Sequence, residues 1–171
     1  MAVTLILEDG SGVEFANTYI LLADARTLAE QYGWALPVLD EDANVALING
    51  YNYLNTLELG MCGQRSYEDQ TGAFPRDNCS CGPFPIASDV IKPEVKQAQV
   101  RAAVTFGAGT DVNPDNDGKN IASEEVTGAV KVSYFNNGKT GGTLKITEAI
   151  QFLERCYLTG ANGINFNVVR G

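Results

Sequence analysis

The chain has 171 residues, of which 44% are hydrophobic, so it can form a domain with a buried core. We therefore do not expect the whole chain to be disordered. Acidic residues outnumber basic ones by 21 to 12, which gives a formal net charge of −9 at pH 7. Because proteins that grip nucleic acid neutralise phosphates with clustered Lys and Arg, this charge argues against such a grip. The sequence contains no histidine, which excludes catalytic triads with an imidazole base.

The start of the chain has none of the features of a targeting segment. The first residues, MAVTLILEDG, lack a basic region and a long apolar run, so we expect no signal peptide. No stretch approaches the roughly 20 apolar residues of a membrane span. We therefore expect a protein made in the cytosol. We also expect reduced thiols at all four cysteines, Cys62, Cys79, Cys81 and Cys156.

A short strand and two helices are expected in the first third of the chain. The apolar, β-branched run at 3–7 is typical of a strand. Apolar residues at helical spacing then predict a helix over 21–32, which the following glycine ends in the left-handed conformation. The same spacing predicts a second helix that Asp40 or Asp42 caps and that ends near residue 60.

The middle of the chain combines an irregular segment with a third helix. Residues 60–91 are rich in glycine and proline, which predicts a long irregular loop. We expect Phe74, Phe84 and Ile86 to anchor it. Pro93 is suited to the first turn of a helix, where its missing N–H is not needed, and this helix should end near residue 107.

The last part of the chain contains a strand, a helix and an extended tail. Apolar and polar residues alternate over 126–135, which predicts a half-buried strand. A fourth helix follows over about 146–157. The predicted fold class is α+β, mainly α: a four-helix bundle core with short β strands or a hairpin, a long irregular loop and an extended C-terminal tail. Residues 1–160 would form a single helical domain, and residues 161–171 the tail.

The tail has a pattern that suits a partner. Ile164, Phe166 and Val168 alternate with asparagines. Ordering its backbone costs about 1–2 kcal/mol per residue, which the burial of a few apolar side chains at about 1.5–3 kcal/mol each does not offset. Pairing with a strand of a partner could close this gap, so we expect the tail, including Val169 and Arg170, to bind a partner. The alternatives are a tail that lies on its own domain and a frayed end.

Two motifs suggest a metal, and both have simpler interpretations. The segment from Asn113 to Glu124 nearly matches a calcium loop, but it begins with Asn, continues with Pro114, and precedes a strand instead of a helix. A solvated turn explains it as well. Cys79 and Cys81, with the other two cysteines, lack the usual spacing of a zinc site, and free thiols are the alternative. We therefore expect no metal, no cofactor and no catalytic residue.

Short motifs occur along the chain in an order that resembles the head–tail adaptor (connector) family of tailed bacteriophages. They are EDGSG at 8–12, ANTYI at 16–20, GQR at 63–65, DQ at 69–70, FPR at 74–76, PI at 85–86, IKPEVKQA at 91–98 and EEVTG at 124–128. The resemblance covers roughly residues 4–158, while residues 79–83 and the tail depart from it. Some members of this group are labelled as DnaT-like single-stranded-DNA-binding proteins.

The resemblance implies a structural protein and not an enzyme. Such subunits form a ring, commonly of twelve copies, beneath the portal at one vertex of the capsid, where they extend the DNA channel and dock the tail. The expected location is the virion, and genomic DNA would pass through the lumen without specific binding. The tail residues would contact the portal. The loop residues would contact neighbouring subunits or tail, nozzle or fibre proteins; they are Arg65, Phe74, Arg76 and Phe84.

Two other functions remain open. One is a single-stranded-DNA-binding accessory protein with a groove lined by Arg65, Arg76 and Arg101. The other is a module stabilised by calcium at 113–124. The first predicts salt-sensitive binding of oligonucleotides, and the second predicts a lower melting temperature after a chelator is added.

Overall fold

The structure is a computed structural model that describes residues 3–109, 123–126, 130–133 and 145–158. The chain divides into two compact units, one of residues 1–110 and 146–171 and the other of residues 111–145. The first unit contains the described helices and the second a β-hairpin. The predicted boundary between domain and tail at residue 160 lies outside the described residues and stays a prediction.

The two predicted N-terminal helices are present. Helix α1 spans Leu22–Tyr32 and ends at Gly33, whose φ of 68° is the predicted left-handed conformation. Helix α2 spans Asp40–Thr56, and a short 3-10 helix, η1, follows at Glu58–Gly60. The predicted aspartate cap is wrong, because Leu39 occupies the cap position and no side chain caps the helix. The Asp40 carboxylate instead pairs with Arg26 at 2.8 Å.

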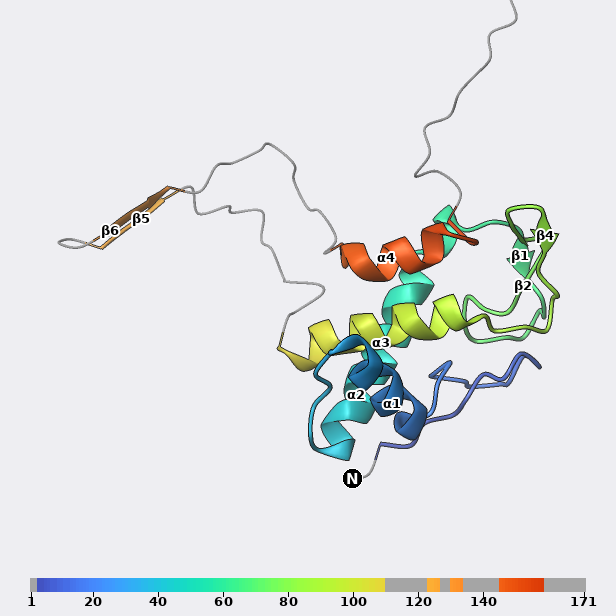
Figure 1. Cartoon of the computed structure of the whole chain (residues 1–171), viewed down its shortest axis with the longest axis horizontal. Coiled ribbons are helices and arrows are strands. Elements are labelled where there is room, and N and C mark those ends of the chain that lie inside the picture. Colours follow the sequence, from blue (N-terminus) through green and yellow to red (C-terminus); the bar gives the residue numbers. More distant parts are fainter. Residues whose placement is uncertain (1–2, 110–122, 127–129, 134–144, 159–171) are drawn as a thin grey trace, which may run out of the picture. The chain divides into compact units, whose positions relative to one another are not determined.

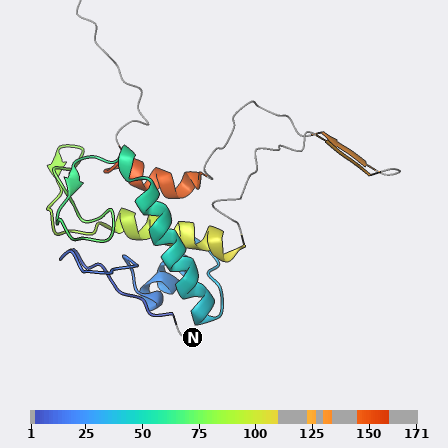
Figure 2. The same cartoon turned by 180° about the vertical axis from the view of Figure 1, so that it is seen from behind.

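Helix α3 is the centre of the first unit. It spans Pro93–Gly107 with Pro93 in the first turn, as predicted, and α4 spans Thr147–Glu154. Helix α3 packs against α1, α2 and α4, and α1 also contacts α2. Helix α2 crosses α3 steeply in two opposite views (Figures 1 and 2). The described chain is thus mainly helical with small antiparallel sheets, but the predicted four-helix bundle is not confirmed.

A buried glutamine connects the N-terminal segment to the helices. Gln99 is fully buried on α3. Its carbonyl oxygen accepts from the backbone N–H of Tyr19 at 2.8 Å, and its amide nitrogen donates to Thr18 at 2.8 Å and to the Leu47 carbonyl at 2.9 Å. Because all these groups are buried, each bond avoids the cost of an unpaired polar atom.

The predicted N-terminal strand at 3–7 is wrong. Residues 3–20 form a loop in which only Leu7 and Thr18 make an isolated bridge. The fold of this loop depends on Glu8, which is 1% exposed. Its carboxylate accepts backbone N–H bonds from Gly10, Gly12 and Val13 at 2.7–3.0 Å. This carboxylate fixes the turn that follows the apolar run, and backbone hydrogen bonds join only the end of that run, at Ile6 and Glu8, to Asn17 and Thr18.

The predicted irregular loop at 60–91 contains two very short hairpins. Strand β1 (Gln64–Arg65) pairs with β2 (Arg76–Asp77), and β3 (Ser80–Cys81) pairs with β4 (Phe84–Pro85), both antiparallel. Of the three predicted anchors, Phe74 is fully buried and Ile86 is buried. Phe84 is 72% exposed, so its predicted anchoring role is wrong. It lies beside the turn of its hairpin, where its side chain projects from the domain.

The cysteines correct another prediction. Cys62 is bonded to Cys79, and Cys81 is bonded to Cys156, so the four thiols that we expected to be reduced form two disulfides. The second disulfide attaches the 60–91 segment to the chain just after α4. The two bonds also occupy every sulfur that the zinc interpretation needed. The prediction used the expected compartment, whereas the fold brings the cysteines together in pairs.

The second unit contains one hairpin. Strand β5 (Ser123–Val126) pairs with β6 (Val130–Ser133) in antiparallel register, with Ser123 opposite Ser133. The strand predicted over 126–135 thus corresponds in part to β6. Its predicted burial and most of the calcium loop at 113–124 lie outside the described residues. Within the described part of the chain, no helix has the length and hydropathy to cross a membrane.

Candidate functional site

A cluster of three aromatic side chains forms part of the surface of the first unit. The rings of Tyr32 and Trp34 are stacked with centroids 4.5 Å apart. Phe152, from α4, meets both rings edge-on with centroids 6.0 Å away. Tyr32 is 44% exposed, and the other two rings are partly exposed. We call Tyr32, Trp34 and Phe152 the aromatic cluster; its open ring surface can stack on a planar ligand.

Polar groups of α3 border the aromatic cluster. The guanidinium carbon of Arg101 lies 5.7 Å from the centre of the Trp34 ring, a cation–π distance. Arg101 also donates to Glu148 on α4, forming an ion pair. Gln97, one helical turn earlier, donates to the Tyr32 hydroxyl at 2.9 Å. Helix α3 therefore supplies a cation and an amide beside the rings.

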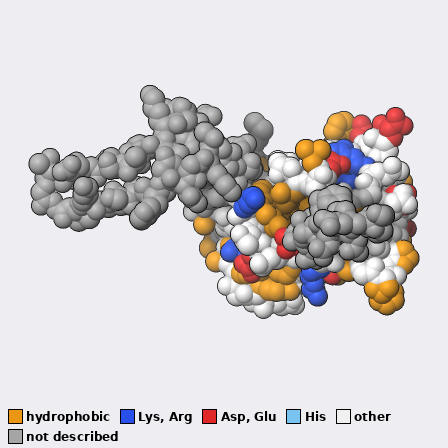
Figure 3. All heavy atoms as spheres, turned by 90° about the horizontal axis from the view of Figure 1, so that it is seen from above, with side chains coloured by type: hydrophobic (Ala, Val, Ile, Leu, Met, Phe, Trp, Pro, Cys, Tyr) orange, Lys and Arg blue, Asp and Glu red, His pale blue; other side chains and the backbone are white. Residues whose placement is uncertain are grey.

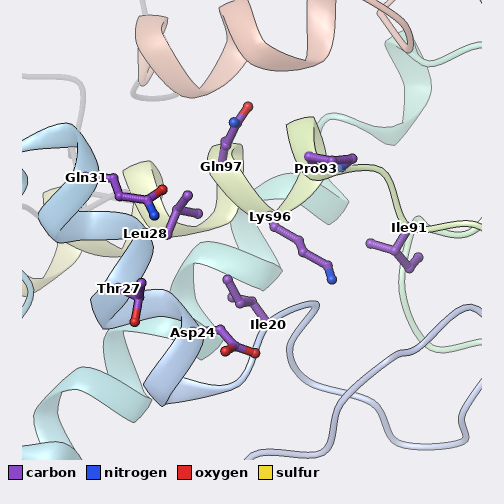
Figure 4. A pocket seen from close by; sticks show the side chains of 9 residues that line it. All are labelled: Ile20, Asp24, Thr27, Leu28, Gln31, Ile91, Pro93, Lys96 and Gln97. Atoms are coloured by element: carbon purple, nitrogen blue, oxygen red, sulfur yellow. The ribbon is translucent and has the colours of Figure 1, made fainter.

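A groove of about 300 Å³ lies between α1 and the start of α3 (Figure 4). Apolar side chains make up most of its surface, and charged and amide groups stand at its rim. The side chains come from one face of each helix and from the segments that precede them. They are Ile20, Asp24, Thr27, Leu28, Gln31, Ile91, Pro93, Lys96 and Gln97. We call this feature the α1–α3 groove.

The helical repeat explains how the groove and the aromatic cluster meet. Along α1 the lining residues recur at spacings of three and four residues, which places them on one side of the helix. Gln97 belongs to both features, because it lines the groove and bonds to Tyr32. Gln31 lines the groove and is followed in the chain by Tyr32. The two features are therefore joined at Gln97, and we treat them as one candidate site.

The arginines that we predicted as contact residues are paired within the protein. Arg65 makes a two-point ion pair with Glu58, with N–O distances of 2.8 and 2.7 Å. Arg76 is 4% exposed. It donates to the Cys62, Gly63 and Ala73 carbonyls and to Glu58. Hydrogen bonds from Arg65 hold the pKa of the Glu58 carboxyl below its usual value.

These ion pairs and hydrogen bonds bear on the predicted DNA groove of three arginines. Arg76 is buried and donates four hydrogen bonds within the protein, so it cannot line a DNA groove without a rearrangement of the 60–91 segment. Arg101 is part of the candidate site, and Arg65 belongs to the other ion pair, with Glu58. The structure therefore does not bring Arg65, Arg76 and Arg101 into one open groove.

The remaining predicted contact residues differ in whether they are buried, exposed or outside the described residues. Phe74 is fully buried and packs edge-on against Tyr19 and Tyr157, so it serves the core. Phe84 is exposed and available to a partner. The tail residues predicted to bind a partner are outside the described residues and stay predictions; they are Ile164, Phe166, Val168, Val169 and Arg170.

The described surface shows no concentration of positive charge on the face in Figure 3. Basic and acidic side chains alternate there among hydrophobic ones, and no continuous basic patch appears among the coloured atoms. Among the described residues, no group of three or more Cys, Asp or Glu side chains could hold a metal ion. The candidate site is thus an aromatic and amide surface with a few charges, suited to stacking and hydrogen bonding.

Sequence reasoning missed the aromatic cluster. Tyr32 was assigned to the predicted helix over 21–32, Trp34 was given no role, and Phe152 lies 118 positions after Trp34 in the sequence. The one available signal was the pair of aromatics on either side of the glycine that ends α1. Nothing in the sequence pattern placed α4 beside them.

The fold and the site describe a small, mainly helical protein that carries two disulfides and an open aromatic surface. A comparison with models of known families matches residues 3–171 to the family described as "Putative DnaT-like ssDNA binding protein". The chain belongs to this family. No curated protein and no solved structure matches the chain. The comparisons therefore agree with the family label that accompanied the adaptor resemblance, and they give no support to the adaptor identity.

Proposed function

We propose that this protein binds single-stranded DNA through the aromatic cluster and the adjoining α1–α3 groove. The observation that carries the proposal is the stack of exposed Tyr32 on partly buried Trp34, with the Arg101 guanidinium beside it. Proteins that bind single strands stack bases on aromatic rings and add cation–π contacts from arginine. The description of the family supports the same class of ligand.

Stacking, not charge, would supply most of the affinity. A base that stacks on an aromatic side chain contributes about 1–3 kcal/mol. The net charge of −9 repels phosphates at long range. Arg101 shares its charge with Glu148, so it offers a phosphate only part of its attraction. The protein would therefore bind exposed bases and discriminate against duplex DNA, whose bases are already stacked.

Trp34 makes this proposal directly testable, because it is the only tryptophan in the chain. Addition of an oligothymidylate should quench the intrinsic fluorescence, and a duplex of the same length should not. Substitution Tyr32→Ala should weaken binding by roughly 5- to 150-fold, the equivalent of one lost stacking contact. Tyr67→Ala is the matched control, because Tyr67 is 39% exposed but lies outside the aromatic cluster.

Thermal melting of both variants separates loss of binding from loss of structure. The proposal fails if the wild-type protein shows neither a fluorescence change nor a mobility shift with oligothymidylate at low salt. It also fails if Tyr32→Ala and Tyr67→Ala bind equally well as folded proteins.

The second candidate function is a head–tail adaptor subunit that forms a ring, with twelve copies as the expected number, beneath a phage portal. One observation favours it: the guanidinium groups of Arg65 and Arg76 are consumed by Glu58 and backbone carbonyls in an acidic protein. Such a surface suits a channel through which DNA must slide. In this function the tail residues Ile164–Arg170 would contact the portal, and exposed Phe84 would contact a neighbouring subunit or a tail protein. Neither candidate function requires a catalytic residue or a cofactor.

Size measurement with and without purified portal protein distinguishes the two functions. An adaptor should form a ring or co-migrate with the portal. The substitution Phe84→Ala should weaken this assembly without changing the melting temperature. Absence of the protein from purified particles would count against the adaptor function, and it would leave the oligonucleotide measurements as the deciding test.

A further inference from the structure

The α1–α3 groove has the size and the lining of a pocket for one flat ring. Its volume of about 300 Å³ is at the lower end of the range for small-ligand pockets. Ile20, Leu28 and Pro93 supply aliphatic surface for the faces of a ring. Figure 4 shows the lining side chains of α1 opposite those of α3, with Ile20 between the two rows. A peptide helix would not fit this space, but a single nucleobase would.

Two opposite charges line the groove, and neither has an ion-pair partner among the described residues. Asp24 and Lys96 both line it. They form no ion pair with each other or with any other side chain in the described part of the chain. A carboxylate only accepts hydrogen bonds and an ammonium only donates them. The groove therefore offers an acceptor and a donor to different edges of the same ligand.

We infer that the groove binds one guanine base of a single strand whose neighbouring base stacks on the aromatic cluster. This inference rests on the proposed function. Guanine presents adjacent N1–H and N2–H donors, which match the two oxygens of the Asp24 carboxylate. It also presents the O6 and N7 acceptors, which match the Lys96 ammonium. Adenine, cytosine and thymine each lack the pair of adjacent donors.

The residue that joins the two features, Gln97, sets the spacing of the two bases. Gln97 lines the groove and donates to Tyr32, and Gln31 lines the groove next to Tyr32 in the chain. A base in the groove and a base on the aromatic cluster would therefore belong to adjacent nucleotides. The site would read one base and hold the next by stacking alone.

Oligothymidylates that differ at one central nucleotide test this inference. With Trp34 fluorescence as the readout, an oligothymidylate with one guanine should bind roughly 5- to 100-fold more tightly than oligothymidylate itself. Replacement of that guanine by inosine, which lacks the N2 amine, should remove much of the gain. Substitution Asp24→Asn should abolish the preference for guanine, so that the oligonucleotides with guanine and with thymine at the central position bind equally well.

The matched control is Glu30→Gln, which removes an exposed carboxylate from the same helix but outside the groove. It should keep the preference for guanine. Equal affinities of the wild-type protein for all four central bases would overturn the inference while oligothymidylate binding upholds the proposed function. A preference for guanine that persists in Asp24→Asn would also overturn it. Absence of binding to every oligonucleotide would instead defeat the proposed function, and this inference with it.

Discussion

At the scale of single residues, Glu58 organises the segment that follows α2. Its carboxylate accepts hydrogen bonds from Arg65 and from buried Arg76, so it joins two strands of a hairpin to the end of the helix. Arg76 in turn satisfies three backbone carbonyls that a chain this irregular leaves without ladder partners. A buried cation thus takes the place of regular secondary structure.

The carboxylate of Glu58 should make stability depend on pH. The hydrogen bonds from Arg65 lower its pKa in the folded protein below the ordinary value of 4.5. A group with a lowered folded pKa contributes stability above its unfolded pKa and loses it as the pH falls through the folded pKa. Substitution Glu58→Gln should therefore destabilise the protein by about 1–3 kcal/mol at neutral pH. The difference between the two proteins should shrink below about pH 4.5.

Melting temperatures measured from neutral to acidic pH check this prediction. Glu68→Gln is the control, because Glu68 is an exposed carboxylate in the same segment. A difference between wild type and Glu58→Gln that stays constant down to the lowest pH would show that the ion pairs are not its cause.

At the scale of elements, the crossing of α2 and α3 depends on Gly50. A Cβ atom at this position would lie 2.6 Å from the Gln99 carbonyl oxygen and 3.1 Å from the Ala103 nitrogen, both backbone atoms of α3. Alanine favours a helix over glycine by about 1 kcal/mol, but the two helices would have to separate. We expect Gly50→Ala to destabilise the protein by about 1–3 kcal/mol net.

Chemical denaturation measures this effect. Asn52→Ala is the control on the same helix, because Asn52 is exposed. The control should be neutral or slightly stabilising. A Gly50→Ala protein as stable as Asn52→Ala would contradict the close crossing of the two helices.

The two disulfides differ in the length of chain that they enclose. Cys81 and Cys156 are 75 positions apart, whereas Cys62 and Cys79 are 17 apart. A longer closed loop restricts the unfolded chain more, so removal of either disulfide should lower the free energy of unfolding by about 2–4 kcal/mol. Removal of Cys81–Cys156 should lower it by about 1 kcal/mol more than removal of Cys62–Cys79. Paired Cys→Ser variants and their melting temperatures test the order.

Thiol titration of the denatured protein tests the pairing itself. No thiol should react before reduction, and four should react after it. Reactive thiols before reduction would restore the earlier expectation of free cysteines.

Elements fixed by interactions between residues close in the sequence could be predicted, whereas elements fixed by distant residues could not. Helix α1 and its end at Gly33 could be predicted, because the spacing of apolar residues and a left-handed glycine act within a few residues. The strand at 3–7 could not be excluded, because the buried Glu8 carboxylate that turns the chain looks like any exposed acid in the sequence. The disulfide partners depend on distant segments, so spacing alone could not reveal them.

At the scale of the whole molecule, the candidate site depends on contacts across the chain. The aromatic cluster combines the end of α1 with α4, and Arg101 reaches it from α3. Sequence reasoning identified Arg101 as a contact residue but grouped it with arginines that the fold pairs with Glu58. The net charge argued against nucleic-acid binding, whereas the family match supports the single-stranded-DNA alternative.

The same net charge predicts an unusual salt dependence for DNA binding. For single strands, the slope of log affinity against log salt is about −0.7 for each phosphate that a cation neutralises. Among the described residues, Lys96 and Arg101 are the cations at the candidate site, and Arg101 is already paired. The slope should therefore be about −1 or shallower, because added salt also screens the repulsion between the strand and a protein of charge −9. Titrations with oligothymidylate from low to moderate salt measure it through Trp34. A slope near −4 would require a cationic face elsewhere, and it would place binding outside the aromatic cluster and the groove.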